Sequence, residues 1–297
     1  MELTVDIPMP LVMPDQAFLG DYWRLAEDGR RRLENSKVAF VGLARNCAQP
    51  LAHNLRRIVE AGAKCRQWCL HIEENDSEDE TVQVMHSFCE QFRQGTYTSQ
   101  RLQRKQYGAE FAGPRTIALA EYRDACQRWV EDTAADSDYV CVVDFDAWGG
   151  WIQTGFLNAV GWLTELPGAY GMAAVSLFQY GEPPRWCHYD LWALRGLGQA
   201  DCYFDAYQNG YGAFGFTWLP PVGSPPVLVS SAFGGFALYR TEAYLQGTYD
   251  GTADCEHVAF HRSIANATGQ HLYVCPGLRT VMSWHVGESN GGQHSHD

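Results

Sequence analysis

Two carboxylates at the end of an apolar run are the residues of this sequence best suited to chemistry. The stretch 139–143 reads Tyr-Val-Cys-Val-Val, and Asp144 and Asp146 follow it, separated by one phenylalanine. Side chains alternate along a strand, so residues i and i+2 point to the same side. Two carboxylates on one side can bind a divalent hard cation, which in turn neutralises a diphosphate. A turn is the alternative interpretation, because Asp is common in turns and Gly149-Gly150 follow.

Two more polar clusters follow predicted strands. Ala44-Arg45-Asn46 ends the apolar run 38–44, and the acidic loop 73–80 follows a predicted strand over 68–73. In an open α/β sheet, ligands bind beyond the carboxyl ends of the strands, so we expect these clusters to form one site with Asp144.

The acidic loop has two interpretations. Acidic residues after an early strand of a nucleotide-binding sheet accept hydrogen bonds from a ribose or base, which makes Glu74 and Asp76 candidates. Alternatively, the loop is a solvated turn in which Ser77 or Asp79 caps a helix that begins at Thr81.

Two arginines on one predicted helix are candidates for phosphate binding. Arg115 and Arg123 are two turns apart, and the planar guanidinium suits phosphate. Arg115 follows Gly113-Pro114 at the helix start, where backbone amides also favour anions. A surface position on an amphipathic helix is the alternative for Arg123.

The elements that position these residues alternate between strand and helix. Apolar periodicity predicts helices over 50–62, 81–92, 115–130, 156–166 and 254–267, and strands over 38–44, 68–73, 139–143, 227–239 and 271–275. Strands that are apolar throughout and separated by helices predict a mainly parallel sheet covered on both faces. From Gly168 to Val227 glycine, proline and aromatic residues dominate, which is typical of long loops or short strands.

Composition excludes several classes of protein. The 297 residues are 46% hydrophobic and 19% charged, which is globular rather than disordered. The net charge of −13 argues against nucleic-acid binding, which depends on Lys and Arg contacts to phosphate. The basic clusters 30–32 and 101–105 are interpreted as solvated surface. No apolar run of about 20 residues and no signal peptide is present, so we expect a cytoplasmic protein without a membrane span.

Cysteine and histidine spacings give no zinc site. The ten cysteines are expected to be reduced and mostly buried, because the chain shows no export signal. Cys65-x3-Cys69 and His257-x3-His261 each lack further ligands at a zinc-binding spacing.

In this order, the motifs resemble the nucleotide-sugar half of a GT-A glycosyltransferase. They are Ala44-Arg45-Asn46, Glu74-Asn75-Asp76-Ser77, Arg115 with Ala120-Glu121-Tyr122-Arg123, and Asp144-Phe145-Asp146. More narrowly, residues 38–285 are similar to the capsule-associated mannosyltransferase-like family of fungi. The matching later segments are Tyr189 to Arg195, Val229 to Gly235, and Asp254 to His257. The sequence departs from that family at Asp124, where Asn is usual, at Asp144-Phe145-Asp146, and in having no preceding membrane anchor.

The resemblance implies a GT-A (Rossmann-like) fold with a mixed, mainly parallel sheet flanked by helices and an irregular acceptor-side C-terminal half. It implies a GDP- or UDP-sugar donor, Mn²⁺ or Mg²⁺, and a glycan or other hydroxyl acceptor. The expected donor-binding residues are Ala44, Arg45, Asn46, Glu74, Asp76, Arg115, Arg123 and Asp144. The expected metal ligands are Asp144, Asp146 and His285, because GT-A enzymes often add a C-terminal histidine to the metal site.

Catalysis and acceptor binding are assigned to the second half of the chain. An inverting enzyme needs a base for the acceptor hydroxyl, and Asp254 and Glu256 are the candidates, whereas a retaining enzyme can lack one. A helix cap is the alternative for Asp254. Asp190 is expected to contact the donor sugar. The expected acceptor-binding residues are Trp148 and Trp192, whose rings can stack on sugars, with Gly234 and Gly235.

We therefore divide the chain into an N-terminal extension (1–35), a nucleotide-sugar-binding half (36–150), an acceptor and catalytic half (151–286) and a flexible tail (287–297). Two alternatives remain open. One is a haloacid-dehalogenase-like phosphatase, which also carries Asp-x-Asp after an apolar strand. The other is a non-catalytic sugar- or nucleotide-binding protein. Within the transferase class, an enzyme that glucosylates nucleic acid also stays possible.

Overall fold

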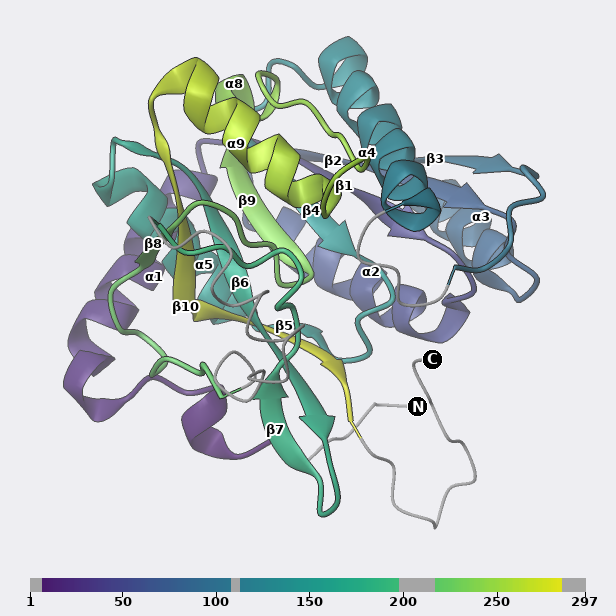
Figure 1. Ribbon diagram of the computed structural model, residues 1–297. Helices are drawn as coiled ribbons and strands as arrows, with labels where there is room; N and C mark the ends of the chain where they lie inside the picture. The colour runs from purple at the N-terminus through teal and green to yellow at the C-terminus, as the bar shows by residue number, and fades with distance from the viewer. Residues whose placement is uncertain (1–6, 108–112, 198–216, 285–297) are drawn as a thin grey trace.

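The structure, a computed structural model, describes residues 7–107, 113–197 and 217–284 (Figure 1). The helices are α1 (Leu19–Leu33), α2 (Ala48–Gly62), α3 (Thr81–Gln91), α4 (Pro114–Thr133), α5 (Gln153–Glu165), α8 (Thr241–Tyr244) and α9 (Glu256–Thr268). Two short 3-10 helices, Met9–Leu11 and Gln16–Phe18, precede α1. The strands are β1 (Lys37–Ala44), β2 (Gln67–Asn75), β3 (Gly95–Gln100), β4 (Tyr139–Asp144), β5 (Gly150–Trp151), β6 (Ala169–Tyr180), β7 (Arg185–His188), β8 (Val227–Val229), β9 (Phe236–Arg240) and β10 (His271–Ser283).

The described strands form one mixed, mainly parallel sheet. Its order is β3-β2-β1-β4-β9-β6-β10-β5, with β7 added to β6 and β8 added to β10. The pairs β3–β2, β2–β1, β1–β4 and β6–β10 are parallel, whereas β9 runs antiparallel to both β4 and β6. The carboxyl ends of β1, β2 and β4 therefore meet at one edge of the sheet.

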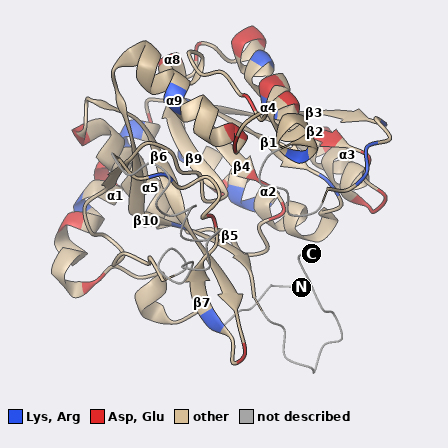
Figure 2. Ribbon diagram, viewed as in Figure 1, with Lys and Arg blue, Asp and Glu red and all other residues tan. Residues whose placement is uncertain are grey.

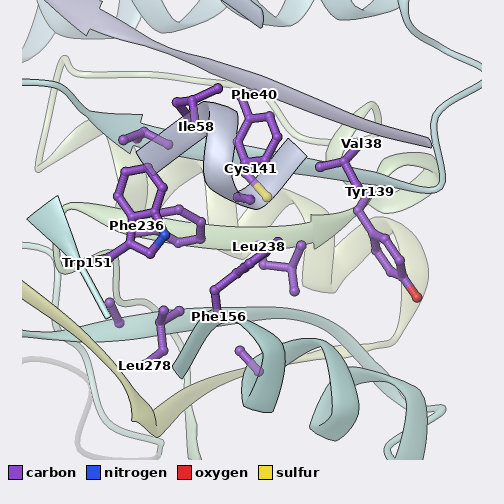
Figure 3. Packing of buried hydrophobic residues seen from close by; sticks show 14 of the residues in the cluster. Val38, Phe40, Ile58, Tyr139, Cys141, Trp151, Phe156, Phe236, Leu238 and Leu278 are labelled. Carbon is purple, nitrogen blue, oxygen red and sulfur yellow. The ribbon is translucent and has the colours of Figure 1, made fainter. Parts of the chain in front are cut away.

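Helices cover both faces because the central strands are apolar on both sides. Along β1, Val38 and Phe40 belong to one buried cluster, and Ala39 and Val41 belong to the other. Residues of α1, α2, α3 and α5 complete the first cluster, and residues of α4, α8 and α9 complete the second. In the first cluster, the rings of Phe40 and Phe236 lie 6.4 and 5.7 Å from the ring of Phe156 in α5 (Figure 3).

Helix α1 packs closely on α5. A Cβ on Gly29 would lie 1.9 Å from the carbonyl oxygen of Leu157, and one on Gly161 would lie 2.2 Å from that of Leu25. Only glycine fits at both crossings. The stretch 1–35, which we set apart as an extension, thus contributes Leu25 and other buried residues, and the proposed division of the chain stays a prediction.

Most expected elements are present, and the main differences concern β6, the pair β8 and β9, and β3. The stretch 169–180 was expected to be loop or short strand, and this was wrong: it forms the 12-residue β6. β6 is buried on both faces from Ala169 to Leu177, so it lacks the alternation that marks a half-buried strand. The single strand expected over 227–239 is two strands, β8 and β9, separated by Gly234 and Gly235 with positive φ angles.

A further difference is β3, an edge strand that the sequence analysis missed. Its sequence Gly-Thr-Tyr-Thr-Ser-Gln is polar, and it pairs only with β2 among the described residues. The described cysteines are all free, as expected, and Cys202 lies outside the described residues. None of the described helices is both long and apolar enough to cross a bilayer.

Candidate functional site

The Asp144–Asp146 pair lies where β4 ends. The backbone N–H of Asp144 donates to Gly235 O at 2.9 Å, which fixes the last residue of the strand against the chain entering β9. Asp144 is half-buried and Asp146 reaches solvent. A surface cavity of about 510 Å³ lies at the opposite edge of the sheet, beside Lys37 and Trp68, and no carboxylate lines it.

Asn54 holds the loop that carries Asp146. Its buried side-chain amide donates to Phe145 O at 3.0 Å and to Ala147 O at 2.8 Å, the two carbonyls that flank Asp146. The sequence analysis missed this residue. A polar side chain on the apolar face of a helix, beside Leu51 and Leu55, was the clue that could have found it.

The two carboxylates repel each other. The surrounding protein desolvates the Asp146 carboxyl, although solvent reaches it, and the negative charge of Asp144 adds to this effect. Together they raise the pKa of Asp146 to about 6. The positive charges of Arg123 and Arg115 oppose the shift. Asp146 therefore has an unfavourable negative charge that a bound cation would stabilise.

Arg123 links β4, α4 and α9. Its Nη2 lies 3.1 Å from Asp144 Oδ1, and its Nε lies 2.9 Å from Glu256 Oε1. The guanidinium carbon lies 4.8 Å from the centre of the Phe233 ring. Burial alone would lower the pKa of Arg123, but the charges of Asp144 and Glu256 raise it well above its usual range. Arg123 is thus an enclosed cation and not the surface arginine of the alternative interpretation.

Asp190 is fixed by backbone groups. Its Oδ2 accepts from Gly234 N at 2.7 Å, and its Oδ1 accepts from Ala193 N at 3.2 Å. Its own N–H donates to Ser176 Oγ at 3.0 Å. Desolvation raises the pKa of Asp190, aided by the charges of Asp144 and Glu256 and opposed by the two backbone donors.

The glycines at 234 and 235 are required by close approach. A Cβ on Gly234 (φ 68°) would lie 2.3 Å from Ala174 O, and one on Gly235 (φ 74°) would lie 2.9 Å from Met282 Sδ. Both bring backbone groups to the aspartates, since Gly234 N binds Asp190 and Gly235 O binds Asp144.

Asp254 pairs with a second buried arginine. Arg195, which is fully buried, places Nη2 2.7 Å from Asp254 Oδ1. The same oxygen accepts from Cys255 N at 2.7 Å. Helix α9 begins at Glu256 and shows no side-chain cap, so Asp254 does not act as its N-cap. The side chain of Asp254 is 26% exposed, compared with 3% for Glu256.

Arg115 and Trp192 meet across the site. The guanidinium carbon of Arg115 lies 4.3 Å from the centre of the Trp192 ring, a cation–π geometry. Arg115 occupies the first turn of α4. Trp148 is half-buried, and its backbone N–H donates to Met282 O at 3.0 Å, which joins the aspartate loop to β10.

The loops after β1 and β2 hold each other. Asn46 N donates to Ser77 Oγ at 3.0 Å, and Asn46 Oδ1 accepts from Glu78 N at 2.7 Å. Asp79 accepts from Thr81 N and from Ala48 N, each at 3.0 Å. The first two polar clusters thus lie together at the carboxyl edge, as the sequence predicted.

The acidic side chains of the second loop bind protein groups. Glu74, beside Ala44 in the β1–β2 register, accepts from Ser77 N at 2.7 Å and from Ser99 Oγ at 2.5 Å. Asp76 accepts from Gln103 N and Arg104 N at 2.8 and 3.0 Å. Burial alone would raise the pKa of Asp76, but hydrogen bonds from Asn75 and from the backbone of 102–104 lower it to about 2. Contact of Glu74 and Asp76 with a nucleotide stays a prediction.

The basic segment 101–105 lies beside these loops. Arg45 donates to Arg104 O at 2.7 Å and to Lys105 O at 3.2 Å, and Arg101 donates to Ser77 O at 2.8 Å. Arg104 also forms an ion pair with Glu121 of α4. Figure 2 shows this basic stretch continuing from β3. The segment is mostly exposed, as the interpretation as solvated surface expects, and it also bonds to the loops after β1 and β2.

The histidines of α9 are structural. His261 bonds Ser231 Oγ at 3.0 Å and Tyr239 Oη at 2.8 Å. His257 stacks on Phe233 with ring centres 4.0 Å apart. His261 is thus a hydrogen-bonded core histidine, as expected, whereas neither ring nitrogen of His257 has a hydrogen-bond partner among the described residues.

The described residues supply two of the three metal ligands that the sequence analysis expected. No group of three His, Cys, Asp or Glu side chains in the described part of the chain is arranged to hold a metal ion. Asp144 and Asp146 supply hard carboxylate oxygens, and Mg²⁺ is commonly held by one or two carboxylates together with waters and substrate phosphates. The third expected ligand, His285, lies outside the described residues.

The sequence matches no family model and no curated protein. Among solved structures, the chain is similar to a mannosyltransferase from Pyrobaculum calidifontis in complex with GDP-Man and Mn²⁺. The TM-score is 0.50 at 16% identity, over 89% of this chain and 64% of that chain. The fold of this chain is of the GT-A type. The GT-A fold and the mainly parallel sheet flanked by helices are thereby confirmed, and the narrower capsule-associated resemblance stays a prediction.

Two other solved structures that match this chain are TarS 1–349 from S. aureus and mannosyl-3-phosphoglycerate synthase from Rubrobacter xylanophilus. For TarS the TM-score is 0.48 at 12% identity, over 83% of this chain and 60% of that chain. For the synthase it is 0.44 at 14% identity, over 89% and 72%. This chain thus spans less than two thirds of the length of the mannosyltransferase and of TarS.

Proposed function

We propose that the protein is a metal-dependent glycosyltransferase. It transfers a hexosyl unit from a GDP- or UDP-sugar to a hydroxyl of a glycan or another acceptor. One observation carries the proposal: the Asp144–Asp146 pair lies at the carboxyl edge of a GT-A sheet, within the electrostatic reach of Arg115, Arg123 and Asp190.

Asp144 and Asp146 would hold Mn²⁺ or Mg²⁺, with His285 as the expected third ligand. A cation held there would neutralise charge on the departing diphosphate. Arg115, at the start of α4 and within electrostatic reach of Asp146, is placed to bind the same diphosphate. Arg123 acts through Asp144, because its Nε and Nη2 are already engaged by two carboxylates.

Asp254 is the stronger candidate for the base. Its side chain reaches solvent, and its Oδ2 has no protein donor among the described residues, so it can accept the acceptor's proton. Glu256 is enclosed and engaged by Arg123, which favours a supporting role. Asp190, fixed by two backbone donors, is suited to accept hydrogen bonds from sugar hydroxyls. Base catalysis by Asp254 implies inversion at the anomeric carbon.

The acceptor side is proposed to include Trp148, Trp192, Gly234 and Gly235. The Trp192 ring already has Arg115 on one face, so a donor phosphate on Arg115 and a sugar at Trp192 would be neighbours. The donor side keeps Ala44, Arg45 and Asn46 at the end of β1, with Glu74 and Asp76 at the end of β2.

The test is a thermal-shift screen of GDP- and UDP-sugars with and without Mn²⁺. A ligand that binds only the native state raises the midpoint of unfolding by mass action. We expect a Mn²⁺-dependent rise with one donor that Asp146→Asn abolishes. Asp132→Asn makes the same charge change at an exposed position near the far end of α4, and should keep the rise. A folded wild type that responds to no donor would contradict the proposal.

The same sample separates the alternatives. A haloacid-dehalogenase-like phosphatase would release inorganic phosphate from a phosphomonoester in a reaction that needs Asp144. A non-catalytic relative would bind a donor without transferring or hydrolysing it. The likeness of fold to a mannosyltransferase supports the transferase over the phosphatase, and only transfer from a donor separates it from the non-catalytic relative.

A further inference from the structure

Strand β6 extends past the end of β4 beside the candidate site. Ala237 of β9 pairs with Val142 of β4 on one side and with Ala173 of β6 on the other. Beyond these paired residues, β4 continues only to Asp144, whereas β6 continues to Tyr180. The last residues of β6, paired with β7, therefore project beyond the carboxyl edge that holds Asp144 (Figure 1).

One face of this hairpin carries aromatic side chains. Phe178 and Tyr180 are two residues apart on β6 and share a face. The ring of Phe178 lies 5.8 Å from that of Tyr180 and 5.3 Å from that of Tyr189, which follows β7. Tyr180 is 61% exposed and Tyr189 is 39% exposed. We call these three residues the aromatic face.

The aromatic face begins at the candidate site. Tyr189 N donates to Ser176 O at 3.1 Å, and the next residue, Asp190, donates to Ser176 Oγ. Desolvation and the negative charges of Asp146, Asp190 and Asp144 raise the pKa of Tyr189. The face thus runs from the neighbourhood of the aspartates outward to Tyr180.

We propose that the aromatic face binds the sugar rings of an oligosaccharide acceptor beyond its reacting unit. This inference rests on the proposed function and adds that the acceptor is a glycan of two or more rings. Aromatic rings bury the apolar C–H face of a pyranose, and tyrosine hydroxyls can bond its hydroxyls. Phe178 and Tyr180 are separated by about 6.6 Å along the strand, which is on the order of one sugar unit.

The neighbouring charges favour a neutral glycan as the occupant. A nucleic acid laid along the face would bring further phosphates next to Asp146 and Asp190, in addition to the donor diphosphate that the proposed cation already has to neutralise. A glycan has no such charge.

The test compares binding of short glycans to the full-length protein. Calorimetric titration uses mannotetraose, cellotetraose, maltotetraose and chitotetraose, each beside its methyl monoglycoside. We expect one tetrasaccharide to bind more tightly than its monoglycoside. Tyr180→Ala should weaken that binding by about threefold to tenfold and leave the monoglycoside unaffected. Tyr180→Phe keeps the ring and should restore most of the affinity.

Trp23→Ala removes an exposed aromatic ring on α1 and should change nothing. The inference is overturned if no tetrasaccharide binds at millimolar concentration, or if Tyr180→Ala binds it as tightly as the wild type. It is also overturned if sedimentation shows a dimer that Tyr180→Ala separates, because the face would then join two copies. Donor binding is measured on the same sample. If the glycan binds and no donor does, the inference about the aromatic face is supported and the proposed transferase function is contradicted.

Discussion

Removing the Arg123 guanidinium should show how much the stability of the protein depends on the buried cation that pairs with Asp144 and Glu256. Arg123→Met keeps much of the apolar stem and deletes both ion pairs. Glu256, with a side chain 3% exposed, then loses its partner at 2.9 Å. Asp144, with a side chain 24% exposed, loses its partner at 3.1 Å. Deleting one partner of a buried pair costs about 3–5 kcal/mol, because it leaves an uncompensated charge.

The size of the loss in free energy of unfolding distinguishes a buried network of ion pairs from an ordinary pair on the surface. Arg128 and Asp124 lie on the same helix with side chains 61% and 44% exposed. Arg128→Met should therefore cost less than about 1 kcal/mol. Since a domain is stable by about 5–15 kcal/mol, the Arg123 variant should still fold, with a clearly lower midpoint.

The assay is urea unfolding followed by tryptophan fluorescence, arranged as a double-mutant cycle with Glu256→Gln. The double variant should lose less free energy of unfolding than the sum of the two single losses, by about 1–3 kcal/mol, because Glu256→Gln relieves the charge that Arg123→Met leaves unpaired. Additivity within about 0.5 kcal/mol, or equal losses for Arg123→Met and Arg128→Met, would refute the reasoning.

Two further predictions concern the loops around the site. Asn54→Asp removes the amide that holds both carbonyls beside Asp146, so the Mn²⁺ concentration needed for the donor-induced thermal shift should rise severalfold. Asn158→Asp alters an equally buried amide, bound to Tyr22 O, and should leave that concentration unchanged; equal changes in both variants would argue against a positioning role. Asp76 has a pKa of about 2 in the folded protein against an ordinary 3.8, so its ionised form contributes stability above the ordinary value that is lost as pH falls through the folded value. Asp76→Asn should thus cost free energy of unfolding at pH about 5 and almost none at pH about 2 in urea titrations, and a cost independent of pH would contradict this assignment.

The sequence predicted the elements whose burial is encoded locally. β1 and β4 are apolar at nearly every position, and each is followed at once by polar residues, so both the strands and the site at their ends could be inferred. β6 has the same apolar character over Ala169–Leu177. It lies, however, in the stretch from Gly168 to Val227, where glycine and aromatic residues dominate and where the sequence showed no other strand beside it. Its identity as a strand depends on pairing with β9 and β10, which lie far away in the sequence.

The site residues divide in the same way. Asp144 and Asp146 could be proposed as site residues because their position at a strand end follows from the sequence. Asn54 was missed because its function lies in contacts with a loop more than ninety residues away. Arg123 was found as a cation, but its enclosure between Asp144 and Glu256 arises only when α4 and α9 pack on the same face of the sheet.

The pairing of charges suggests an order of events at the site. Asp144 and Glu256 are compensated by Arg123, and Asp254 is compensated by Arg195, so these three carboxylates have a nearby positive charge before any ligand binds. Asp146 has no ion pair among the described residues, and its pKa is raised to about 6. A cation at the site would therefore stabilise the ionised form of Asp146 first. Since like charges repel, the diphosphate of a donor should bind well only after that step, beside Arg115. We therefore expect donor affinity to fall strongly when the divalent cation is removed. Above pH 7, where Asp146 is already ionised, we expect the affinity for the cation to change little with pH.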